Sequence, residues 1–219
     1  MTKILMFWKS TLGKKVVMGV TGLIMIGFVI LHMVGNLQAF IGSEKLNAYG
    51  AMLHGPLHEI TLILRAILLA SLVLHVVAAV QLTLLDRAAR PVGYARKVEQ
   101  AATPASRTLR IGGIVLLLFI VLHLLHFTTG QLHPDFIEGD VYHNLISGLS
   151  VPLVAVLYIV AMAAVGLHLY HGAWSSLRSL GAAQPRPNPL HRPIARVIAV
   201  VVWLGFTVIP VAVLLGVLH

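Results

Sequence analysis

Cysteine is absent from the 219-residue sequence, and this absence excludes several kinds of site. Disulfides, thiolate metal centres, cysteine-ligated iron–sulfur clusters and covalently attached c-type haem all need that residue. Charged residues are also scarce, at 11% of the chain, against about 25% in an average soluble domain. Hydrophobic residues make up 58%, which is more than a soluble domain can bury. The composition therefore predicts an integral membrane protein.

Five apolar stretches are long enough to cross a membrane, which takes about 20 residues. The first could be mistaken for a secretory signal, but it exceeds the length of a signal's apolar region and contains no Ala-x-Ala cleavage site. The sequence thus predicts an all-α fold, a single transmembrane domain over residues 1–219 built as a bundle of five helices. We expect these helices at about residues 16–41, 60–85, 109–129, 150–172 and 194–218.

Basic residues flank alternate ends of the predicted helices. Fourteen of the 16 lie before the first helix, between the second and third, or between the fourth and fifth. Only Lys45 and Arg65 lie on the other side, together with five of the seven acidic residues. Because positive residues accumulate on the cytoplasmic side, we expect the N-terminus inside and the C-terminus outside the cell inner (plasma) membrane. The net charge of +9 then reflects topology, and we expect no nucleic-acid partner.

Twelve histidines are many for so apolar a chain. Ionisable side chains in a bilayer are costly and usually face the interior of the bundle. A neutral imidazole can bind haem iron without adding net charge. The alternative for any one histidine is a hydrogen bond to a nearby carbonyl or a place at the rim of a polar cavity. Those in or near the first four spans are His32, His75, His123, His126, His168 and His171.

Depth sorts these histidines into two levels when residues are counted from the inner charged flank at about 1.5 Å each. His75 and His168 lie about 15–16 Å above that flank, in the inner half. His32 lies at about 25 Å, with His123 and His126 at about 20 and 24 Å. Two stacked bis-histidine haems need two facing histidines at each of two levels. Depth alone slightly favours His126 over His123 as the partner of His32, and leaves both open.

Several stretches of the sequence occur in the order and spacing of a known family. The chain resembles the five-helix, di-haem cytochrome b membrane-anchor subunit of succinate:quinone oxidoreductases, the succinate dehydrogenases and fumarate reductases of respiratory complex II. The resemblance extends from the first helix to the fourth. The matching stretches are His32-Met-Val-Gly-Asn36, Leu74-His75, Ala105-Ser106-Arg107-Thr108, His123-Leu-Leu-His-Phe-Thr-Thr-Gly130, Asp140-Val-Tyr-His-Asn144 and Leu167-His-Leu-Tyr-His-Gly-Ala-Trp174.

The resemblance implies two haem b groups, held by His32 with His123 at the outer level and by His75 with His168 at the inner level. It also implies a flavoprotein subunit and an iron–sulfur subunit on the cytoplasmic face. Electrons would pass between the iron–sulfur subunit and a membrane quinone, menaquinone or ubiquinone. Succinate would not be oxidised by this chain, which has no flavin motif. Some members carry a glutamate linked to proton movement where this chain has Gly166, so that route is not expected here.

Five further residues are candidates for contact with the cofactors. Ser106 and Arg107 belong to the matching stretch at the start of the third helix, where Arg107 is either a partner of a propionate or quinone, or a cytoplasmic anchor. Arg65 lies outside, where topology does not explain it; we favour a propionate partner over a snorkelling arginine. His126 and His171 each follow an expected ligand by three residues and share its helix face. Either could support that ligand or contact a propionate, but we favour a plain polar contact near a helix end for both.

The first outer loop offers titratable groups for a quinone site, although a solvated polar loop explains them equally well. They are Glu44, Tyr49, His54, His58 and Glu59. Two other functions remain possible from the residues alone. One is a di-haem cytochrome b serving a hydrogenase or formate dehydrogenase. The other is a histidine-lined metal transporter, which would usually show carboxylates or broken helices within the membrane.

Overall fold

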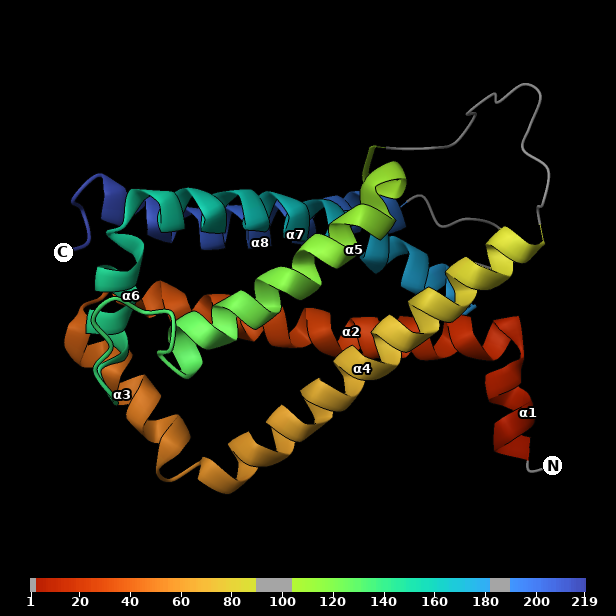
Figure 1. Cartoon of the computed structure of the whole chain (residues 1–219), viewed down its shortest axis with the longest axis horizontal. Coiled ribbons are helices and arrows are strands. Elements are labelled where there is room, and N and C mark those ends of the chain that lie inside the picture. The colour runs from red at the N-terminus through yellow and green to blue at the C-terminus, as the bar shows by residue number, and fades with distance from the viewer. Residues whose placement is uncertain (1–2, 90–103, 182–189) are drawn as a thin grey trace.

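The computed structural model describes residues 3–89, 104–181 and 190–219, and every regular element in these ranges is helical (Figure 1). A 3₁₀ segment, η1 (Leu37–Phe40), extends α2, and a π-helical segment, η2 (Leu124–Thr128), extends α5. The α-helices are α1 (Lys3–Lys9), α2 (Thr11–Asn36), α3 (Ser43–His54), α4 (His58–Ala88), α5 (Pro104–His123), α6 (Val141–Leu149), α7 (Pro152–Ser179) and α8 (His191–Leu214).

Five helical stretches in the described residues are long and apolar enough to cross a membrane, which confirms the all-α fold and the five predicted spans. The two termini lie at opposite ends of the long axis of the molecule (Figure 1), as an odd number of spans requires. Which end faces the cytoplasm stays a prediction from the charges. The stretches are Thr11–Phe40, His58–Ala88, Arg107–Thr128, Pro152–Ser179 and His191–Leu214.

The helix ends differ from the predicted ones where local chemistry extends or stops the helix. The last helix ends at Leu214 rather than at 218 because Gly216 adopts a φ of 69°. The N–H of Val217 then donates to the carbonyl of Ala212 at 2.8 Å, which completes a Schellman cap. By contrast, α7 continues seven residues beyond its predicted end, with Arg178 in its last turn, where a cation favours the helix dipole.

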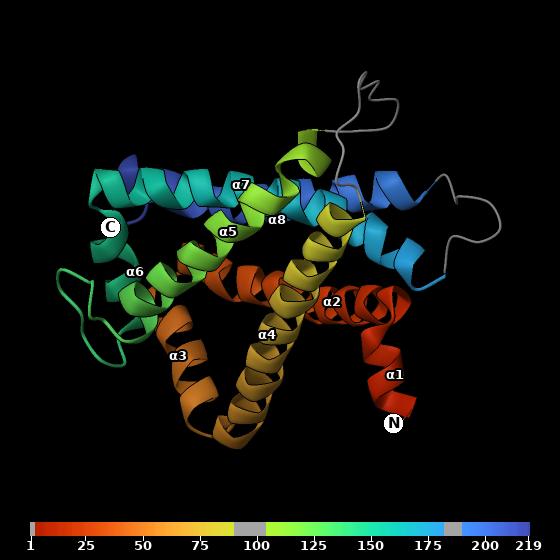
Figure 2. The same cartoon turned by 45° about the vertical axis from the view of Figure 1, so that its right-hand side comes forward.

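The long helices pack unequally. Helices α7 and α8 run side by side, and α2 packs against both α4 and α7 (Figures 1 and 2). Only 11% of the most apolar window of α4 and 6% of that of α5 is buried, against 28% in α7 and 33% in α8. At the ends that the charges predict to be cytoplasmic, called the inner ends from here on, Arg110 of α5 and Asp86 of α4 form an exposed ion pair of 3.2 Å. Helices α4 and α5 are therefore each held mainly by one neighbour, α2 and α7 respectively.

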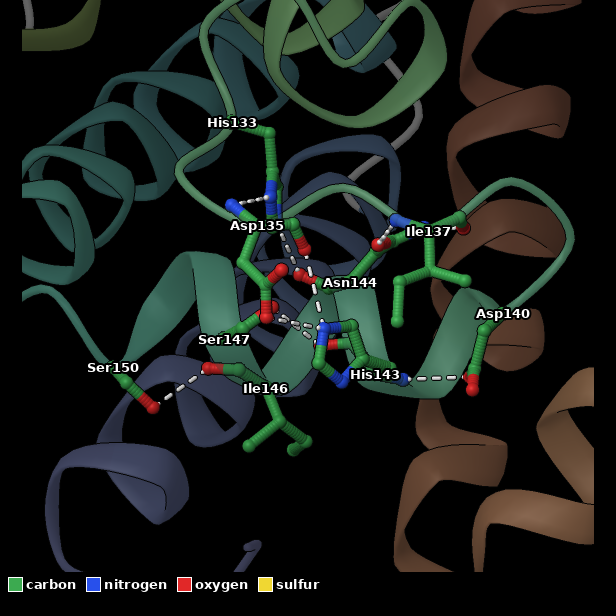
Figure 3. Close-up of polar contacts among 9 residues, drawn as sticks. All are labelled: His133, Asp135, Ile137, Asp140, His143, Asn144, Ile146, Ser147 and Ser150. Atoms are coloured by element: carbon green, nitrogen blue, oxygen red, sulfur yellow. Dashed lines mark hydrogen bonds and ion pairs between the residues drawn. The ribbon is translucent and has the colours of Figure 1, made fainter.

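The outer connections contain two helices that the sequence analysis did not foresee, α3 and α6, and these pack on each other. The Asn47 amide group donates to Asp140 Oδ1 at 2.9 Å, and its carbonyl accepts the N–H of Tyr142 at 2.9 Å. Asp140 also caps α6 by accepting the N–H of His143 at 2.9 Å (Figure 3). These two donors lower the pKa of Asp140 below its usual value, because they stabilise the carboxylate.

Candidate functional site

The outer histidine pair joins the first and third spans. His32 on α2 and His123 at the end of α5 have ring centroids 5.9 Å apart, with an angle of 80° between the rings. Phe28 stacks on the His32 ring at 5.3 Å, and Phe206 of α8 lies 5.8 Å from it. The Asn36 amide donates to the His32 carbonyl at 2.7 Å. The same amide nitrogen lies 3.3 Å from each ring nitrogen of His32, so aromatic rings and an amide surround this imidazole in part.

The inner pair joins the second and fourth spans. His75 on α4 and His168 on α7 have ring centroids 6.3 Å apart. The Nδ1 atom of His75 lies 3.1 Å from the carbonyl oxygen of Met18. Because a carbonyl only accepts hydrogen bonds, Nδ1 carries the proton, and Nε2 keeps a lone pair. A histidine that binds a metal usually donates its other N–H to such a partner.

The two pairs lie at two separate levels. Residue 22 of α2 lies against His75, since a Cβ added to Gly22 would come within 3.4 Å of His75 Cε1. His32 is ten residues further along the same helix, or about 15 Å along its axis. On α7, Tyr158 contacts His123, and His168 follows it by ten residues, again about 15 Å. Both helices therefore separate the inner pair from the outer pair by the same distance.

The spacing of each pair suits a metal ion between two axial imidazoles. With a metal–nitrogen distance of about 2.0–2.1 Å, and about 1 Å from nitrogen to ring centre, such rings lie about 6 Å apart. The observed spacings are 5.9 and 6.3 Å. Among the described residues, no group of three or more His, Cys, Asp or Glu side chains could hold a metal ion. Two donors alone hold a bare ion poorly, whereas a porphyrin supplies four more nitrogens to its iron.

An apolar groove adjoins the inner pair. It has a volume of about 160 Å³ and lies between α5 and α7, with His168 in its wall. The Nδ1 atom of His168 is buried without a hydrogen-bond partner. The groove therefore leaves a small apolar space beside one imidazole of the inner pair, and His75 is not part of its wall. Its other lining residues are Thr108, Leu109, Ile111, Gly112, Val115, Ala164 and Leu167.

His126 contacts Tyr158 and His133, and the ring contacts of the described residues pair His32 with His123 instead. His126 belongs to η2, is 3% exposed, and its Nδ1 is 3.0 Å from the Tyr158 hydroxyl. Its ring stacks on that of His133 at 5.0 Å. The structure therefore brings His123, and not His126, to His32.

His171 lies near the inner end of α7, beside Trp174. The two rings are 5.6 Å apart in an edge-to-face contact. The same indole lies under two cations, with the guanidinium carbons of Arg178 and Arg192 5.3 and 4.9 Å from its centre. His171 thus lies beside a cationic cluster, and its buried Nδ1 has no hydrogen-bond partner.

The predicted cofactor-contacting residues on α4 and α5 lie within the first eight residues of each helix. Arg65 donates from Nη2 to His54 Nε2 at 3.1 Å, a partner that the sequence analysis did not foresee. A guanidinium has five N–H donors, so this contact leaves others for a second acceptor. Arg107 is exposed in the first turns of α5. Ser106 belongs to the same helix, but its side chain lies outside the described residues.

Tyr158 and Met18 contact the histidine pairs and were missed by the sequence analysis. Tyr158 touches both His123 and His126, and Met18 contributes only its backbone carbonyl. A lone aromatic residue in an apolar span is usually a packing residue, and a backbone acceptor has no sequence signature. Neither residue therefore offered a signal.

Comparison with known proteins leaves this geometry as the main evidence for function. No family model, curated protein or solved structure matches the chain. The interpretation therefore depends on the two histidine pairs, the topology and the resemblance of the motifs.

Proposed function

We propose that this chain is the membrane-anchor cytochrome b subunit of a succinate dehydrogenase. It binds two haem b groups and passes electrons between an iron–sulfur subunit and a membrane quinone, menaquinone or ubiquinone. Its flavoprotein and iron–sulfur partners dock on the cytoplasmic face, and they oxidise the succinate. The chain is then part of an enzyme with no succinate site of its own, and belongs to the inner (plasma) membrane.

The strongest support for this proposal is the presence of two histidine pairs, the outer one and the inner one. Each has an imidazole spacing of about 6 Å, which axial ligation of one iron requires. Each joins two different spans, and the pairs lie about 15 Å apart along α2 and α7. A site for a single metal ion does not account for two such levels. Two haems, one at each level, do.

Each histidine has a separate task in this assignment. His75, with its Nδ1 proton on the Met18 carbonyl, would hold the inner haem together with His168. His32 and His123 offer nitrogens to the outer iron. The haems supply one-electron redox chemistry, and the protein supplies ligands, orientation and surrounding charge. The apolar side chains of the spans exclude water from both levels.

The cytoplasmic face is assigned to the soluble partners on charge and topology. Helices α5 and α7 have Arg107, Arg110 and Arg178 at their inner ends. A polar protein surface can cover such cations, whereas the acidic outer face would repel acidic surfaces. Affinity purification of the chain should recover a flavoprotein and an iron–sulfur protein. Recovery of a hydrogenase or formate dehydrogenase instead would refute the succinate dehydrogenase assignment while keeping the haem proposal.

The haem proposal is tested by counting haem in the purified chain and in its histidine variants. A pyridine haemochrome assay should give two haems per wild-type chain. His75→Ala or His168→Ala should lose the inner haem and keep the outer one, because iron without one axial ligand is poorly held. His32→Ala or His123→Ala should lose the outer haem.

Two neighbouring histidines serve as matched controls on the same segments of chain. His126→Ala and His171→Ala remove imidazoles three residues from the assigned ligands and should keep both haems. One haem or none in the wild type would overturn the proposal. If His126→Ala lost the outer haem while His123→Ala kept it, the ligand assignment on the third span would be wrong.

A further inference from the structure

We infer that Tyr158 is a positioning residue for the outer haem ligand His123, whose orientation and basicity it sets through a hydrogen bond to the imidazole Nδ1. This inference rests on the proposed function, since it assigns His123 to an iron. The Tyr158 hydroxyl oxygen lies 3.4 Å from His123 Nδ1 and 3.0 Å from His126 Nδ1. Among the described residues, Tyr158 therefore carries the one hydroxyl that contacts two of these imidazoles.

The chemistry of the three groups sets the direction of both hydrogen bonds. A histidine that binds iron through Nε2 carries its proton on Nδ1, so His123 donates to the Tyr158 oxygen. The hydroxyl has one proton of its own, and it donates this proton to His126 Nδ1 at the shorter distance. Tyr158 is thus an acceptor toward the ligand, as a residue that orients a metal-bound histidine should be.

The surrounding aromatic side chains hold the hydroxyl in place. Tyr158 is 8% exposed and lies between Phe119 and Phe127, with edge-to-face ring contacts of 5.0 and 5.5 Å. Such contacts restrict the ring beyond the effect of burial alone. A polar group fixed by packing can orient a partner, whereas a mobile one cannot.

The π-helical segment brings both imidazoles to the same hydroxyl. Helix α5 gives way to η2 directly after His123, and the wider π turn alters the direction of the side chains that follow. His126 consequently reaches Tyr158 while His123 still faces His32. Single π turns of this kind occur frequently at functional sites.

When a neighbouring oxygen accepts a hydrogen bond from the Nδ1 proton of a histidine, that histidine becomes a stronger electron donor to its metal. A stronger donor stabilises ferric iron relative to ferrous iron, and so lowers the midpoint potential. Removal of the Tyr158 hydroxyl should therefore raise the midpoint potential of the outer haem. The loss of one neutral hydrogen bond should change the ferric–ferrous equilibrium by up to about fivefold, which corresponds to about 40 mV for one electron.

The test compares Tyr158→Phe with Tyr170→Phe in the purified complex. Tyr158→Phe keeps the ring and its packing and removes only the oxygen. Tyr170→Phe makes the same change twelve residues further along α7, at a side chain packed against the buried residues Met33, Leu169, Ala199 and Val202. Both variants should keep two haems. Redox titration should show one midpoint raised in Tyr158→Phe and both midpoints unchanged in Tyr170→Phe.

The ferric low-spin EPR spectrum gives a second readout, because it depends on the angle between the axial imidazole planes. Tyr158→Phe should alter one of the two signals, since His123 loses the contact that holds its ring. Unchanged potentials and unchanged EPR signals would overturn the inference, as would a Tyr158→Phe chain that loses a haem or fails to accumulate. A wild-type chain with fewer than two haems would refute the proposed function itself.

Discussion

Asp140→Ala should loosen the outer end of the molecule, where α3 and α6 pack on each other. Asp140 makes two hydrogen bonds there, from the N–H of His143 and from the Asn47 amide, both at 2.9 Å. Loss of an aspartate N-cap costs about 1 kcal/mol. A hydrogen bond to a charged acceptor contributes about 1.5–3 kcal/mol, and the low end applies because the carboxylate is only half-buried. Screening by solvent at this half-buried position reduces the sum of the two contributions to about 2 kcal/mol.

Hydrogen exchange measures this loss locally, in the amides of α6. A change of about 2 kcal/mol corresponds to roughly 30-fold faster exchange of these amides at neutral pH. The matched control is Asp140→Asn, which keeps a side-chain oxygen that caps α6 nearly as well and can still accept from Asn47. It should accelerate exchange much less than Asp140→Ala.

The lowered pKa of Asp140 also predicts a pH dependence. Because the folded pKa lies below the unfolded one, the stabilisation is fully present above the unfolded value of about 3.9. It is lost as the pH falls through the folded pKa. The stability advantage of the wild type over Asp140→Asn should therefore shrink below about pH 4. Equal exchange in Asp140→Ala and wild type, or equal effects of the two variants, would refute the reasoning.

Two other substitutions test contacts near the histidine pairs. Arg65→Leu should keep both haems but lower one midpoint potential in a redox titration, because a nearby cation favours the ferrous form. His54→Ala keeps the cation and is the control. An unchanged pair of potentials in Arg65→Leu would leave Arg65 only its contact with His54. Gly148→Ala should destabilise the chain by about 1–3 kcal/mol, because the added Cβ would lie 2.9 Å from the His126 ring. Thermal unfolding should show this loss of stability in Gly148→Ala but not in Gly27→Ala, where the added Cβ would have no atom within 4 Å. Equal effects of the two variants would contradict the packing argument.

The sequence by itself determined the number of spans and the approximate depth of each histidine. Spans follow from apolar length alone, since a membrane requires about 20 such residues whatever lies beside them. Depth follows from the fixed rise of about 1.5 Å per residue along any helix. That rise placed His75 and His168 together on one level, and the structure has them 6.3 Å apart. The roles of these histidines as iron ligands stay predictions.

Depth left open which side chains face one another within a level; the resemblance implied the partners, and the tertiary structure shows them side by side. From depth, His126 suited His32 slightly better than His123 did, yet the structure places His123 beside His32 and turns His126 toward Tyr158. The π segment responsible has no apolar periodicity of its own, and the rotation of a helix about its axis depends on its neighbours.

The outer helices show the same division between local and long-range information. Asp140 is a recognisable N-cap residue, but its second partner, Asn47, is 93 residues away in the sequence. The Arg65 partner, His54, lies across the α3–α4 connection and looked like part of a solvated loop. Hydropathy and helix geometry act along the chain and can be read from it, whereas hydrogen bonds between helices exist only once packing has fixed their positions.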